Sequence, residues 1–297
     1  MDKDTRLLMR AIADREVVHN EIDRHLEMLQ AIIDRGEIHN EMDCLKTISI
    51  SVTDYCNLKC PMCPNSLDDY IHKEHRDMSI ETMDKVCERL QELPTLVLPR
   101  ITISGNGEPM LNKNIIVLLH NLWDMGIRPT LITNGTIEPA DKELIEKHTN
   151  IIVSIHDMNR EKELRELWPT ATFRNNDPGS PSCELHTTNR GGIMGKPEQR
   201  NLNPCTCLFY KMSIDVDGNY LKCAEVFNKV PPAFAKSVYN MSIEEYFTKQ
   251  IEHLKILMAT KGRQGICGCT DCDIDGTLVG MKYVEWYKNE YCKRTSR

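Results

Sequence analysis

The sequence lacks a run of about 18 apolar residues, the length an apolar helix needs to cross a membrane. It also starts without an apolar signal segment. We therefore expect a cytoplasmic protein with no membrane partner. Because disulfides are rare in that reducing compartment, the 13 cysteines do not indicate a disulfide framework.

The sequence has no excess of basic residues either. Lysine and arginine number 37 against 44 acidic residues, which gives a net charge of −7 and a pI near 5.8. A protein that binds nucleic acid through its phosphates usually carries a basic surface, so a nucleic-acid partner is not expected. A chain of 297 residues can form one large domain and a smaller one.

Residues 1–44 form a charged segment with apolar residues at helical intervals, which predicts a helical N-terminal extension. Within it, the sequence Val18–Ile22 (VHNEI) is nearly repeated at Ile38–Met42 (IHNEM). The His-Asn-Glu pair could ligate a metal, but nothing fixes the two copies on a common site. We interpret them as solvated helix faces related by a small duplication.

From residue 45 to about 198 the pattern alternates between strand and helix, which predicts an α/β fold with a parallel sheet. Four or five strands fit into this length, so we expect a partial, TIM-like barrel with its site at the carboxyl ends of the strands. The expected strands are 47–53, 99–105, 128–133, 150–155 and 170–174, and the expected helices are 79–92, 112–125, 138–148 and 160–168.

Three cysteines with the spacing CxxxCxxC, Cys56, Cys60 and Cys63, follow directly on the first expected strand. Three thiolates on one loop can hold three irons of a four-iron cluster and leave the fourth open to a small chelating molecule. A structural zinc site is the main alternative. It normally takes a fourth ligand from a second CxxC or a histidine pair, and His72 and His75 do not have the usual spacing.

The cysteine spacing and its surroundings resemble the radical S-adenosylmethionine (SAM) superfamily. This resemblance implies that the open iron binds SAM and that an electron from the 4Fe-4S cluster cleaves it to a 5′-deoxyadenosyl radical, which abstracts hydrogen from a substrate. It also implies an external electron donor such as flavodoxin or ferredoxin. Met62 occupies the position that the family places beside the adenine.

The loops after the next strands carry small and polar residues that also suggest SAM contacts. Gly105, Asn106, Gly107 and Glu108 resemble the family's GGE motif, with Asn106 where glycine is more usual. The βα pattern places Asn134, Ser154 and His156 at or near the carboxyl ends of predicted strands, so we expect them to point to the same end of the barrel. Each of these three could bind SAM, touch substrate or be a satisfied polar group at a strand end.

A second group of cysteines lies downstream: Cys205, Cys223, Cys269 and Cys272. Four thiolates from separate loops could saturate a second cluster or a zinc ribbon, and spacing alone does not separate the two. The Asp217-Gly218 pair predicts a hairpin before Cys223.

This downstream group resembles Twitch, the reduced form of the SPASM domain, which implies one auxiliary 4Fe-4S cluster and two clusters in total. Residues 199–297 are then a Twitch-like domain with a C-terminal helix. Cys207 or Cys267 could replace a neighbouring ligand, and the other cysteines (Cys44, Cys87 and Cys183) are read as buried or free thiols.

Taken over residues 47–275, the order of motifs resembles radical SAM dehydrogenases that combine a shortened barrel with a Twitch domain. The resemblance implies an oxidoreductase that passes an electron from a small sugar, cyclitol or nucleoside-type substrate to the auxiliary cluster. Arg190, in an Asn-Arg-Gly-Gly segment, is a candidate catalytic residue, although a solvent-exposed turn explains it nearly as well. A peptide-modifying enzyme (an epimerase or cross-linking enzyme), a sugar epimerase and a non-enzymatic metal module remain alternatives.

Overall fold

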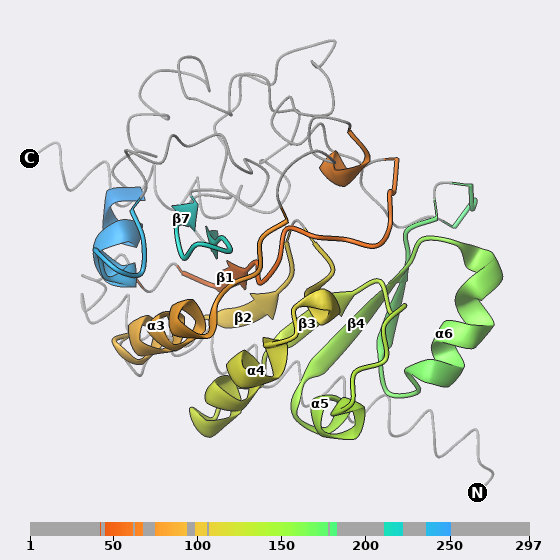
Figure 1. Ribbon diagram of the computed structural model, residues 1–297, viewed down its shortest axis with the longest axis horizontal. Helices are drawn as coiled ribbons and strands as arrows, with labels where there is room; N and C mark the ends of the chain where they lie inside the picture. Colours follow the sequence, from red (N-terminus) through yellow and green to blue (C-terminus); the bar gives the residue numbers. More distant parts are fainter. Residues whose placement is uncertain are drawn as a thin grey trace, which may run out of the picture. The chain divides into compact units, whose positions relative to one another are not determined.

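The computed structural model describes a seven-stranded sheet flanked by helices (Figure 1). The residues it describes are 42, 45–61, 63–67, 75–93, 99–105, 107–177, 179–182, 211–221 and 236–250. The predicted N-terminal extension, with its His-Asn-Glu repeat, falls almost entirely outside this set. None of the described helices is long and apolar enough to span a membrane.

Five strands and four helices alternate in the order that the sequence predicts. The strands are β1 (Thr47–Ile50), β2 (Arg100–Ile103), β3 (Thr130–Thr133), β4 (Asn150–Ile155) and β5 (Thr172–Asn175). The helices are α3 (Ile80–Gln91), α4 (Ile115–Asp124), α5 (Lys142–His148) and α6 (Glu161–Leu167), with short 3₁₀ turns η2 (Pro64–Ser66), η3 (Pro109–Leu111) and η4 (Met158–Arg160). The predicted α/β class with a mostly parallel sheet is confirmed.

The sheet order is β5-β4-β3-β2-β1-β6-β7, where β6 is Lys211–Ile214 and β7 is Tyr220–Leu221. Strands β1 to β6 all pair in parallel, and only β7 pairs antiparallel, with β6. The sequence did not predict that β6, which lies beyond residue 199, pairs with β1. The predicted division into domains at that residue stays a prediction.

The two faces of the sheet differ in polarity because side chains alternate along each strand. Ile48 and Ile50 of β1 are fully buried, whereas Thr47 and Ser49 between them are partly exposed. In register with Ser49 lie two more small polar residues, Thr102 and Ser213. The order from β1 to β5 is sequential, so right-handed crossovers place α3 to α6 on one face of the sheet (Figure 1).

The hairpin predicted before Cys223 is present between β6 and β7. Gly218 has a φ of +78°, a left-handed conformation that glycine adopts without strain. The Asp215 carboxylate accepts hydrogen bonds from the backbone N–H groups of Asp217 (3.0 Å) and Asn219 (2.8 Å). The turn is therefore fixed by its own side chains.

Candidate active site

The carboxyl ends of β1 to β4 bring the predicted site residues of four loops to one edge of the sheet. The β1 loop carries the three cysteines, and the loops after β2, β3 and β4 carry Glu108, Asn134 and His156. Parallel strands end at the same edge, so residues that follow them converge there. The structure thus brings together segments about 100 residues apart in the chain.

Cys56, Cys60 and Cys63 are free, partly buried thiols on this edge. The Cys63 N–H donates to the Cys60 carbonyl (2.9 Å), and Ser66 Oγ donates to the Cys63 carbonyl (2.7 Å), so the loop is held by local hydrogen bonds. Burial, with the neighbouring Cys63 and Cys56, raises the pKa of the Cys60 thiol to about 11. Burial also raises the pKa of Cys56.

The donor set fits an iron–sulfur cluster. Thiolates are soft ligands that iron–sulfur clusters prefer. In a cluster each cysteine binds a different iron, so the sulfurs need not converge on one point. Among the described residues, no group of three or more His, Cys, Asp or Glu side chains is arranged to hold a metal ion.

Gly105 and Gly107 let the β2 loop lie directly against the cysteine loop. A Cβ on Gly107 would lie 2.3 Å from the Tyr55 carbonyl oxygen and 2.7 Å from that of Thr53. A Cβ on Gly105 would lie 2.2 Å from Ser51 Oγ. In the structure the two glycines admit the neighbouring loop, and their predicted contact with a ligand stays a prediction.

Glu108 lies beneath the site and is almost fully buried, at 2% exposure. Its carboxylate accepts hydrogen bonds from Thr133 Oγ1 (2.6 Å), the Asn134 N–H (2.7 Å) and the Met110 N–H (3.1 Å). Burial raises the pKa of this carboxyl group, and the three hydrogen bonds oppose that shift. In this structure Glu108 ties the β2 loop to the end of β3, and contact of its carboxylate with a ligand stays a prediction.

Asn134 joins the end of β3 to the cysteine loop through two residues that the sequence analysis missed. Its Nδ2 donates to Asn57 Oδ1 (2.9 Å), and its Oδ1 accepts from the N–H (3.0 Å) and hydroxyl (2.7 Å) of Thr136. Asn57 Nδ2 donates in turn to Thr136 Oγ1 (2.8 Å). Their positions give a signal in retrospect, since Asn57 follows Cys56 directly and Thr136 lies just beyond a strand end.

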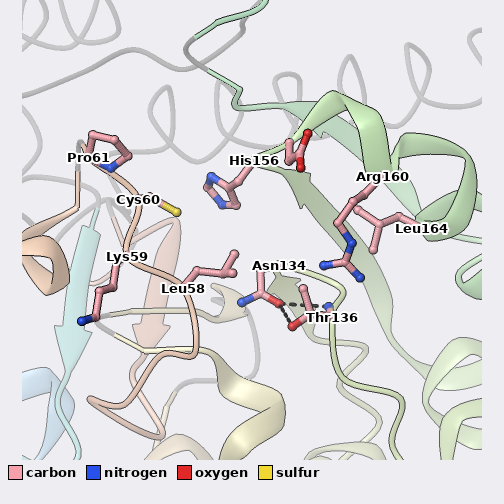
Figure 2. Close-up of a pocket in the computed structure, with 10 residues that line it drawn as sticks. Leu58, Lys59, Cys60, Pro61, Asn134, Thr136, His156, Arg160 and Leu164 are labelled. Carbon is pink, nitrogen blue, oxygen red and sulfur yellow. Dashed lines mark hydrogen bonds between the residues drawn. The ribbon is translucent and has the colours of Figure 1, made fainter.

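A pocket of about 280 Å³ opens between the cysteine loop and the ends of β3 and β4 (Figure 2). Leu58 and Cys60 line one side of it, His156 and Arg160 line the other, and Asn134 lies between them. Sequence analysis predicted Cys60, Asn134 and His156 here and missed Arg160, which follows β4 on the short turn η4.

His156 lines this pocket and has a ring nitrogen without a hydrogen-bond partner among the described residues. This nitrogen is the buried Nδ1. Burial lowers the pKa of the imidazole, and the charge of Asp177 opposes that shift. The imidazole lines the pocket, while its Nδ1 is enclosed by the protein.

Ser154 lies on β4, two residues before His156, which follows the last residue of the strand. It is 7% exposed and does not line the pocket, but it is in register with Arg174 of β5. Cys87 is buried, as predicted. The other predicted site residues lie outside the described residues: Met62, Asn106, Arg190, Cys205, Cys207, Cys223, Cys267, Cys269 and Cys272.

The fold and the site define a mostly parallel α/β sheet, as in a partial barrel, with a thiol-bearing loop at the carboxyl ends of its strands. Residues 50–176, from the end of β1 to just beyond β5, match the family model described as the Radical SAM superfamily. Residues 50–176 are therefore similar to the radical SAM superfamily.

Individual relatives are distant. GTP 3′,8-cyclase of Clostridium perfringens (strain SM101 / Type A) is 29% identical over 127 residues, 40% of this chain and 38% of that protein. The S-adenosyl-L-methionine-dependent 2-deoxy-scyllo-inosamine dehydrogenase of Niallia circulans is 26% identical over 190 residues, 61% of this chain and 74% of that protein. The chain thus spans under two fifths of the cyclase, at 38%.

Among solved structures, BtrN in complex with AdoMet and 2-DOIA superimposes with a TM-score of 0.63. The superposition covers 78% of this chain and 94% of BtrN, and the sequences are 24% identical. At this identity the likeness supports the shared fold.

Proposed function

We propose that this protein is a radical SAM oxidoreductase that binds a 4Fe-4S cluster through Cys56, Cys60 and Cys63. The observation that carries the proposal is the position of three partly buried thiols beside a pocket at the carboxyl ends of the parallel strands. This part of the chain matches the radical SAM family model. When bound, the cluster and SAM together supply a radical that removes hydrogen from a substrate.

The residues around the pocket bind and orient the ligands. We assign SAM contacts to Met62, to the loop Gly105, Asn106 and Gly107, and to the polar residues Ser154 and His156. Asn134 holds the cysteine loop through its bond to Asn57. Glu108 keeps the β2 loop and β3 in register through its three hydrogen bonds. Arg190 is assigned to the substrate, where a guanidinium can donate to a hydroxyl group.

The downstream cysteines Cys205, Cys223, Cys269 and Cys272 are proposed to hold an auxiliary cluster. The hairpin supports this assignment, because β7 ends at Leu221 and leads directly into the segment that contains Cys223. A cluster whose irons are all bound by protein accepts or donates electrons without binding substrate. In an oxidation, it would receive the electron that the substrate loses.

The substrate class is proposed to be a small sugar, cyclitol or nucleoside-type molecule. The similarity to a dehydrogenase named for 2-deoxy-scyllo-inosamine supports it, as do the pocket's hydrogen-bonding residues Asn134, Thr136, His156 and Arg160. Hydroxyl groups both donate and accept hydrogen bonds, so they suit a pocket that is lined by hydrogen-bond donors and acceptors.

The test is to incubate the anaerobically reconstituted protein with SAM, a reductant and a panel of aminocyclitols, sugars, nucleosides and short peptides. Mass spectrometry should find one small molecule that loses two hydrogens, which is the change from alcohol to ketone. A small molecule recovered at unchanged mass with inverted stereochemistry would indicate an epimerase. A modified peptide would contradict the proposed substrate class.

A further inference from the structure

The sulfur of Cys56 accepts hydrogen bonds from two N–H groups of the protein. The Leu58 N–H donates to Cys56 Sγ at 3.4 Å, within the same loop. Asn134 Nδ2, which belongs to the loop after β3, donates to the same sulfur at 3.9 Å. The second donor comes from a segment 78 positions away in the sequence, so it depends on the fold.

The orientation of the Asn134 amide is fixed by its surroundings. Its Oδ1 accepts the backbone N–H and the hydroxyl of Thr136, and a flipped amide would place its NH₂ group against that N–H. Nδ2 must therefore face the cysteine loop, where one hydrogen meets Asn57 Oδ1 and the other meets Cys56 Sγ. Asn134 itself is held by the bond from its N–H to Glu108.

We propose that Asn134 tunes the reduction potential of the cluster bound by Cys56, and does so by donating to the Cys56 sulfur. This inference rests on the proposed cluster at that site. Reduction adds negative charge that is shared by the cysteine sulfurs, and an N–H donor stabilises that charge. Asn134 is thus a positioning residue that makes the cluster easier to reduce.

The test is a potentiometric titration of the full-length protein after anaerobic reconstitution, followed by electron paramagnetic resonance. The signal to follow is the one that changes when SAM is added, because that signal belongs to the cluster with an open iron. Asn134→Leu removes the donor at similar volume. Its midpoint potential should be more negative than that of the unmodified protein, at equal iron content.

Two further variants complete the experiment. Asn134→Asp keeps the shape and, at alkaline pH, replaces the donor by a negative charge, so its potential should shift further in the negative direction. Asn121→Leu is the matched control, because Asn121 lies on α4 and its amide donates to Asp84 (2.9 Å). Its potential should be unchanged.

The inference is wrong if Asn134→Leu and Asn134→Asp bind iron normally and keep the original potential. If the leucine variant does not assemble a cluster, the aspartate variant decides alone. An unmodified protein that binds no iron would refute the proposed function, which is a separate outcome from an unchanged potential in the variants.

Discussion

Gly107 shows how single residues position the cysteine loop. Its backbone lies so close to the loop that the nearest atoms to an added Cβ are the carbonyl oxygens of Tyr55 and Thr53. Backbone atoms cannot rotate away as a flexible side chain can. Any side chain at position 107 must therefore displace the segment that leads into Cys56.

We expect Gly107→Ala to reduce the iron content of the reconstituted protein and to destabilise the fold by roughly 1–3 kcal/mol, the usual range for a steric clash inside a packed structure. Gly126→Ala is the control, because a Cβ there meets no atom within 4 Å. The φ of +74° at Gly126 makes that change cost about 1 kcal/mol, with iron content unchanged. Equal iron content in both variants would contradict this account.

His156 makes stability depend on pH. Burial lowers the pKa of its imidazole below the ordinary value of 6.5, so the unfolded chain binds a proton more readily than the folded one. The contribution of this group to stability is present above pH 6.5 and is lost as the pH falls through the folded pKa. The charge of Asp177 opposes this shift, and the charged residues Asp157 and Arg160 line the same pocket.

Chemical denaturation at a series of pH values below 6.5 should therefore show a falling free energy of unfolding. His156→Gln should make this part of the curve flatter, because glutamine does not titrate. A variant with the same slope as the unmodified protein would show that another group causes the dependence.

At the scale of elements, α6 supports the loop after β3. Trp168, at the end of α6, is fully buried, and its Nε1 donates to the Gly135 carbonyl at 3.0 Å. Gly135 lies between Asn134 and Thr136, the residues that contact the cysteine loop through Asn57. The indole thus fixes the backbone on which that network is built.

Trp168→Phe should destabilise the protein by about 1–3 kcal/mol, because it leaves a buried carbonyl without its donor and reduces the packed volume. Urea denaturation would measure the loss. Trp123→Phe is a suitable comparison, since Trp123 is only partly buried and its Nε1 donates to Thr149 at a longer 3.3 Å. A larger loss from the Trp123 variant would contradict the role of Trp168.

The sequence was sufficient to predict β1 to β5 and the helices between them, because apolar and β-branched runs alternate with amphipathic ones. It was not sufficient for β6. Lys211–Ile214 is a four-residue segment with no feature that selects β1 as its partner.

The sequence predicted those site residues whose side-chain type itself indicates a chemical role. The cysteines and the polar residues that end β3 and β4 were found for that reason. The contacts that support the site could not be predicted. The burial of Glu108 and the ring of hydrogen bonds among Asn57, Asn134 and Thr136 arise only when separate loops meet. Their residue types are common in ordinary turns.

At the scale of the whole molecule, the proposal requires two clusters in one chain. The reconstituted protein should contain about eight irons per chain, and removing Cys269 and Cys272 together should lower this to about four. Such a variant should still cleave SAM in part, while turnover of substrate is impaired. Full iron content in this double variant would show that these cysteines are not ligands.

The central claim is that Cys56, Cys60 and Cys63 hold an iron–sulfur cluster that cleaves SAM. It is tested most directly by measuring 5′-deoxyadenosine after the anaerobically reconstituted protein receives SAM and a reductant, beside Cys60→Ala treated in the same way. The account predicts 5′-deoxyadenosine from the unmodified protein and none from the variant. A colourless protein that binds only zinc and releases no 5′-deoxyadenosine would contradict it.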